Sequence, residues 1–184
     1  MTNRYALLAI ELAVFSGFTW ALIKWFRETN VIQRWELWFI KIAALIFLIA
    51  HLSVAVFYPL PETVLLFTGI SLLLIGGILF WWTVSVFKDK PPTVAFSGTI
   101  GTELKTKGPY GIVRNPFYTS YSMAWIGGTI ATGCWWLIIS FFCMFFIYWR
   151  AAKFEEQQWL NSKDASNYFT YMQTTGMFLP KLIF

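Results

Sequence analysis

The segment from Gly108 to Pro116 is the part of the chain whose residue types best suit a binding site. It contains two glycines and two prolines, so regular helix is not expected within it. Asn115 followed by Pro116 predicts that a helix begins there, because proline suits the first helical turn. The free N–H groups and positive dipole end of that helix, together with Arg114, would favour a bound carboxylate. The alternative interpretation is an interfacial turn in which Arg114 extends to lipid phosphates.

A second group of charged residues lies between Arg150 and Leu160. Helical spacing predicts that the helix formed by the preceding apolar residues continues through this segment. The adjacent carboxylates Glu155 and Glu156 are suited to accept hydrogen bonds from a cationic ligand. The alternative is a solvated helix end whose acids lie beside a basic membrane surface.

The remaining candidates for chemistry lie inside apolar segments. A histidine or glutamate within a membrane is a functional hint. For His51, a neutral ring hydrogen-bonded to a neighbouring helix is the simpler interpretation, and for Glu11 a neutral or paired carboxyl that faces the bundle. Cys134 and Cys143 have no nearby histidine or carboxylate, so we predict neither a metal site nor a disulfide.

The composition places the chain in a membrane. Hydrophobic residues make up 58% of the 184 residues and charged residues 12%, against about 45–50% and 25% in soluble domains. A soluble domain of this size buries too little surface to hide so many apolar side chains. The same figures exclude disordered, collagen-like and coiled-coil proteins.

Uncharged runs predict where the helices lie. A helix needs about 20 apolar residues to cross a bilayer, and backbone groups in lipid must pair within the helix. We therefore predict an all-α integral membrane protein with a bundle of about five transmembrane helices and a C-terminal helical segment. The predicted spans are about 5–25, 37–58, 63–87, 118–131 and 134–149. The chain would form a single domain, 1–184, in which 1–97 supply three helices and 98–184 carry the motifs.

The basic residues predict the orientation. With five spans, 13 of the 14 lysines and arginines lie on one side of the membrane, and Arg4 alone lies on the other. Loops rich in lysine and arginine face the cytoplasm, so we predict an N-terminus outside and a cytoplasmic C-terminal segment. The net charge of +5 is then a topology signal. Neither a nucleic-acid surface nor an obligate protein partner is predicted.

The two motif segments together resemble the isoprenylcysteine carboxyl methyltransferase family. The run from Gly108 to Tyr118 is similar to the family pattern G-x-Y-x-x-x-R-H-P-x-Y, and the resemblance extends over about residues 98–182. A short apolar hairpin follows, and the size is similar to that of the compact prokaryotic members. The later motifs have the family's order: Arg150, Glu155-Glu156, Tyr168-x-x-Tyr171 and Phe178-Leu179-Pro180.

The resemblance implies a methyltransferase that uses S-adenosyl-L-methionine (SAM) and is embedded in a membrane, in prokaryotes the plasma membrane. Residues 98–184 would form its cofactor-binding core. The family's substrate-side arginine falls on Arg150, and Arg114 adds fixed charge beside the pocket. The positions that match the family's cofactor contacts are Thr102, Glu103, Leu104, Lys105, Tyr110, Asn115, Pro116, Phe117 and Tyr118, with Glu155 or Glu156 as the acidic contact.

Two positions depart from the family pattern. Asn115 stands where the family has histidine and cannot act as a protonatable base, and Ser120 stands where a glycine is usual. The acceptor implied by the resemblance is a lipophilic molecule that enters from the bilayer and is methylated on a carboxyl group. Two alternatives stay open: a phospholipid or amine N-methyltransferase, and a non-catalytic membrane protein that retains the fold.

Overall fold

The computed structural model describes the whole chain except residues 1, 28–33, 88–90, 98–102 and 182–184. Within the described part there are seven α-helices and no strands. The helices are α1 (Thr2–Trp20), α2 (Arg34–Phe57), α3 (Thr63–Ser85), α4 (Pro109–Ile112), α5 (Pro116–Thr132), α6 (Ile138–Leu160) and α7 (Ala165–Thr174). A π-helical turn, Ala21–Trp25, extends α1, and a 3-10 turn, Trp135–Leu137, precedes α6.

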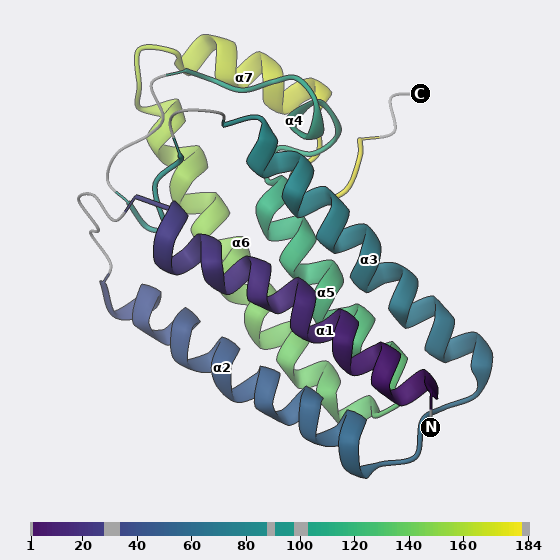
Figure 1. Cartoon of the computed structure of the whole chain (residues 1–184). Coiled ribbons are helices and arrows are strands. Elements are labelled where there is room, and N and C mark those ends of the chain that lie inside the picture. Colours follow the sequence, from purple (N-terminus) through teal and green to yellow (C-terminus); the bar gives the residue numbers. More distant parts are fainter. Residues whose placement is uncertain (1, 28–33, 88–90, 98–102, 182–184) are drawn as a thin grey trace.

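Five long helices, α1, α2, α3, α5 and α6, form a bundle in which successive helices run in opposite directions (Figure 1). Among the described residues, four helical segments are long and apolar enough to cross a membrane: Asn3–Trp25, Trp35–Phe57, Thr63–Ser85 and Trp135–Leu160. The prediction of an all-α membrane protein is confirmed. The predicted fourth span corresponds to α5, which has 17 residues and is largely buried by its neighbours.

The glycines of α3 and α5 allow these two helices to pack backbone against backbone. A Cβ atom at Gly69 would lie 2.2 Å from the Ala131 nitrogen, and one at Gly127 would lie 2.9 Å from the Leu73 nitrogen. Small residues permit such close helix contacts in membranes. Helix α5 runs without a break through Gly127 and Gly128 to Thr132.

The helix ends follow local sequence signals. Pro116 occupies the first turn of α5 as predicted, and Gly133 ends the helix with a positive φ of 65°, a conformation that glycine adopts without strain. The expectation of no regular helix after Gly108 needs a small correction, since Pro109–Ile112 form one helical turn. Beyond the predicted apolar span, α6 continues to Leu160, as its charged second half indicated.

A buried polar cluster joins α1, α2 and α6 inside the bundle. The His51 Nε2 lies 2.9 Å from the Ser140 hydroxyl, which itself donates to the Leu137 carbonyl. Glu11 is fully buried, 3.9 Å from His51 Nδ1. The predicted hydrogen bond between His51 and a neighbouring helix is confirmed, and Glu11 faces the bundle as expected.

The short helices α4 and α7 lie together at one end of the bundle, opposite the end where α1 begins (Figure 1). The end of α1 also reaches this region, because Arg27 forms a parallel bridge with Thr93. The motif segments predicted from the sequence therefore meet at a single end of the molecule.

Candidate active site

The segment after α7 pairs with the loop that precedes α5. Val113 and Gly176 form a parallel bridge. The Arg114 N–H donates to the Gly176 carbonyl at 2.8 Å. The Asn115 N–H donates to the Met177 carbonyl at 3.1 Å. These two N–H groups, which directly precede α5, are therefore satisfied within the protein.

The guanidinium of Arg114 binds a carboxylate of the protein itself. Its Nε and Nη2 donate to Oε1 of Glu156 at 3.0 and 2.8 Å. Its Nη1 donates to the carbonyls of Met172 and Thr175. Because Glu156 is only 3% exposed, this ion pair is buried and joins the loop before α5 to α6 and the end of α7.

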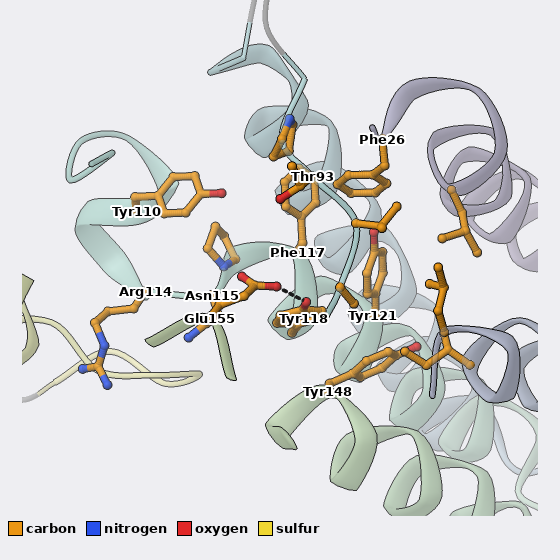
Figure 2. Close-up of a pocket in the computed structure, with 17 residues that line it drawn as sticks. Phe26, Thr93, Tyr110, Arg114, Asn115, Phe117, Tyr118, Tyr121, Tyr148 and Glu155 are labelled. Atoms are coloured by element: carbon orange, nitrogen blue, oxygen red, sulfur yellow. Dashed lines mark hydrogen bonds between the residues drawn. The ribbon is translucent and has the colours of Figure 1, made fainter. Parts of the chain in front are cut away.

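Glu155, the neighbour of Glu156, faces a cavity. Its Oε1 accepts a hydrogen bond from the Tyr118 hydroxyl at 2.5 Å. Figure 2 shows this bond, with the Arg114 side chain extending away from the Glu155 carboxylate. Consecutive residues of an α-helix are rotated by about 100°, so two adjacent acids on α6 have different surroundings.

We call the cavity beside Glu155 the central pocket; its volume is about 110 Å³. Aromatic rings make up much of its wall (Figure 2). The rest of the wall comes from the loop before α5, from residues 92–95, and from the end of α1 and the start of α2, which are predicted to face the cytoplasm. The residues that line it are Leu22, Phe26, Leu37, Ile40, Pro92, Thr93, Val94, Ala95, Tyr110, Arg114, Asn115, Pro116, Phe117, Tyr118, Tyr121, Tyr148 and Glu155.

A second cavity, the polar pocket, adjoins the central pocket and measures about 120 Å³. The two share a wall that includes Tyr110, Asn115 and Glu155. The other residues of the polar pocket come from the ends of α3, α6 and α7 and from the loops: Phe87, Ser97, Glu103, Leu104, Lys105, Gln158, Trp159, Tyr168 and Tyr171. The continuous lining gives one site with a polar half and an aromatic half.

A third cavity, the lateral chamber, lies between α1 and α2 and measures about 300 Å³. Its wall is mainly apolar and includes exposed residues of both helices. Four residues line both the chamber and the central pocket: Leu22, Ile40, Tyr121 and Tyr148. The lateral chamber therefore adjoins the central pocket on the side of the first two helices.

The ionisation states of Tyr110 and Glu103, two residues of the polar pocket outside the membrane spans, follow from their surroundings. Burial, and second the negative charge of Glu155, raises the pKa of Tyr110 well above its usual value, so this phenol is neutral. Lys105 lies 2.6 Å from Glu103, and the hydrogen bond and charge of the lysine lower the pKa of that carboxyl. Glu103 is therefore ionised and paired.

Arg150 lies outside the three cavities. It forms an ion pair with Glu36, which is fully buried at the start of α2. Its guanidinium also lies 6.0 Å from the centre of the Trp35 ring. In the structure, the partner of Arg150 is thus a glutamate of another helix. That Arg150 holds the acceptor stays a prediction.

Most of the predicted cofactor contacts lie on the two connected pockets. Glu103, Leu104 and Lys105 line the polar pocket. The predicted residues Tyr110, Asn115, Pro116, Phe117, Tyr118 and Glu155 line the central pocket. Thr102 lies outside the described residues, and Glu156 is paired with Arg114 rather than lining a cavity. Ser120 is buried and donates to the Phe117 carbonyl, so it does not narrow the pocket.

Sequence reasoning missed the side of the site that is built by earlier helices and by the loop after α3. Leu22, Phe26 and Thr93 lie far from the motifs in sequence, and only the fold brings them to the pocket. Tyr121 and Tyr148 had a weak signal, since Tyr121 is one turn after Tyr118 on the same helix. Trp125, which belongs to none of the motifs, lines the lateral chamber.

A model of the phospholipid methyltransferase family matches residues 64–163, from the start of α3 to just beyond α6. The chain belongs to the phospholipid methyltransferase family. This family is part of the isoprenylcysteine carboxyl methyltransferase-like superfamily of membrane methyltransferases, so the resemblance stated above is confirmed at that level. Among curated proteins, none matches the chain. Members of the family are SAM-dependent methyltransferases, and the protein is accordingly an integral membrane methyltransferase for a lipid-type substrate.

Proposed function

We propose that the protein transfers a methyl group from SAM to an amine in a lipid headgroup, as in phospholipid N-methylation. The observation that supports an amine over a carboxylic acid is the charge of the central pocket. Glu155 faces this pocket, whereas Arg114 is paired with Glu156. Within the described part of the chain, no other cation lines the pocket. A carboxylate acceptor would face the carboxylate of Glu155 without an unpaired cation of the protein beside it, whereas a neutral amine needs no counter-charge.

The residues of the polar pocket fit SAM as the methyl donor. SAM combines an ammonium group with a ribose and an adenine, and it supplies a methyl group carried on a cationic sulfur. Glu155 would hold the ammonium, and the polar side chains of the pocket would hold the ribose. Trp159 and Tyr168 stack with ring centres 5.8 Å apart and would supply an apolar surface for the base.

The aromatic half of the site would hold the acceptor. Tyr118 and Tyr148 stack 5.7 Å apart, and Tyr121 lies 5.5 Å from Tyr148. The faces of such rings attract cations, so these tyrosines would stabilise the positive charge that forms on the amine as it is methylated. They also exclude water and hold the headgroup in line with the donor, which is the main contribution a protein can make to a displacement of this kind.

The chemical nature of the product tests the proposal. The purified protein in nanodiscs is given SAM with a labelled methyl group and either phosphatidylethanolamine or farnesylcysteine. We expect label on the phosphatidylethanolamine nitrogen, where it resists mild base. Label that mild base releases as methanol from farnesylcysteine would identify a methyl ester and overturn the amine assignment.

We further propose that the end of the bundle with the pockets faces the cytoplasm of a prokaryotic plasma membrane. The excess of lysine and arginine on the segments at this end supports the orientation. SAM would then enter from the cytoplasm, and the acceptor would enter from the bilayer. No protein partner is required for this scheme.

A further inference from the structure

The lateral chamber has one charged residue among the described residues that line it, Lys41 on α2. Its Nζ lies 5.3 Å from the centre of the Trp38 ring, and Trp38 is 62% exposed. Tryptophan and lysine side chains gather at the level of lipid headgroups. The ammonium group of Lys41 is therefore expected at the level of the lipid headgroups, on the wall of a chamber that is otherwise mainly apolar.

The chamber adjoins the central pocket, and Lys41 lies on the chamber wall. Ile23 on the π-helical turn and Leu45 on α2 are 66% and 59% exposed and form the outer wall. Tyr121 and Tyr148 form the inner wall and also line the central pocket. A lipid with its chains outside and its headgroup in the central pocket would thus lie along the wall that contains Lys41.

We infer that Lys41 binds the phosphodiester of a glycerophospholipid whose amine lies in the central pocket. The inference rests on the proposed function and assigns a residue to the phosphate of its acceptor. In an ethanolamine-type headgroup the phosphate stands a few bonds from the amine, on the side of the acyl chains. Lysine binds phosphate as a point charge. The acidic central pocket and the basic chamber wall match the order of charges along such a lipid.

An ion pair between Lys41 and the lipid phosphate predicts selectivity between acceptors. Lys41 would favour an amine lipid that carries a phosphate over a long-chain amine that lacks one. A lysine that only anchors α2 at the membrane surface would give no such preference, because its removal would affect both acceptors alike. The comparison of two acceptors therefore separates phosphate binding from a structural role.

The test measures methyl transfer in nanodiscs with dioleoylphosphatidylethanolamine or oleylamine as acceptor. For Lys41→Ala, we expect the KM for the phospholipid to rise about tenfold, with kcat and the KM for oleylamine within about twofold of the wild type. Lys41→Arg should restore the phospholipid KM. Lys163→Ala, which removes an exposed charge between α6 and α7, is the matched control and should match the wild type.

Lipid retention decides the inference independently of activity. Native mass spectrometry measures how much phosphatidylethanolamine stays bound during delipidation. Lower retention by Lys41→Ala than by Lys163→Ala would support phosphate binding. Equal retention, or an equal KM increase for both acceptors, would overturn it. If the wild type methylates neither acceptor, the proposed function fails, and the retention measurement still decides the role of Lys41.

Discussion

Glu155 and Glu156 are adjacent acids with separate tasks. Glu156 neutralises the buried guanidinium of Arg114, whereas Glu155 accepts a hydrogen bond from Tyr118 and lines both pockets. The first contact holds three segments of the chain together. The second leaves a carboxylate where a cationic ligand can reach it. Replacing each acid separately therefore distinguishes ligand binding from folding.

We predict that Glu155→Gln weakens SAM binding and spares stability. The substitution keeps the side-chain shape but removes the charge, and a hydrogen bond to a charged group contributes about 1.5–3 kcal/mol. Isothermal titration calorimetry should show a dissociation constant at least about tenfold higher. Unfolding by sodium dodecyl sulfate should be nearly unchanged.

Glu156→Gln is the matched comparison and should have the opposite effect. It leaves the buried Arg114 without a counter-charge, so the free energy of unfolding should fall by about 3 kcal/mol. Unchanged stability in this variant, or unchanged SAM affinity in Glu155→Gln, would contradict the assignment of the two roles.

The sequence could not choose between these two acids. The family pattern requires an acidic residue at this place, but which acid faces the pocket depends on how α6 is rotated about its axis. That rotation is set by packing against α2, α5 and α7. The same reason applies to Arg150, whose partner Glu36 lies on another helix, more than a hundred residues earlier in the chain.

At the level of helices, the contact between α3 and α5 fixes the position of the motif loop. The start of α5 carries Asn115, Phe117 and Tyr118 to the pocket, and its length lies against α3. Gly69 and Gly127 allow the two backbones to touch. A wider spacing between these helices would displace the wall of the central pocket.

We predict that Gly69→Ala strongly destabilises the protein. Its Cβ would lie 2.2 Å from the backbone nitrogen of Ala131 and 2.5 Å from the Gly127 carbonyl oxygen, and backbone atoms cannot move aside individually. The cost of such overpacking is about 3 kcal/mol. Unfolding in sodium dodecyl sulfate measures it.

Gly77→Ala provides the control on the same helix. Its Cβ would meet only a methyl group of Val14, at 3.2 Å, which a small side-chain movement relieves. We expect a stability close to that of the wild type. Equal losses in the two variants would show that the close contact between α3 and α5 is not what Gly69 provides.

The helices were largely predictable, whereas irregular segments were not. Uncharged runs, Pro116 and Gly133 carry the information for where the long helices lie and end. The π-helical turn Ala21–Trp25 left no signal in the pattern of apolar residues. The tail pairing at Gly176 depends on contacts between distant segments, which hydrophobic patterns do not encode.

At the level of the whole molecule, the site is shared by the two parts of the chain that the sequence distinguished. Residues 1–97 contribute most of the lining of the lateral chamber and one wall of the central pocket. Residues 98–184 contribute Glu155, the motif loop and the tyrosines between the two cavities. The polar pocket lies at the end of the bundle that contains α7, while the chamber lies between α1 and α2. In the proposed function, SAM and the lipid acceptor would meet at Glu155 and the surrounding tyrosines.

This arrangement predicts how activity depends on pH. An amine accepts a methyl group only when it is deprotonated, and its ordinary pKa is about 10. Initial rates with saturating SAM should therefore rise roughly tenfold per pH unit between about pH 6 and 8. Tyr110 stays neutral over this range, because burial and Glu155 raise its pKa, so its ionisation does not lower the rate.

A carboxyl acceptor would give a different profile. Its pKa is about 4, so it is already ionised at pH 6 and the rate would be flat. A flat profile with phosphatidylethanolamine as acceptor would contradict the requirement for a deprotonated amine at the rate-limiting step.

The hydrogen bonds between residues 113–119 and residues 175–178 have a consequence for biosynthesis. The ribosome produces the first of these segments well before the second. Until position 178 has left the exit tunnel, the inserted helices lack the partner that holds the motif loop in place. Catalytic competence therefore arises late, after membrane integration, and a nascent chain halted before that point would be anchored but inert.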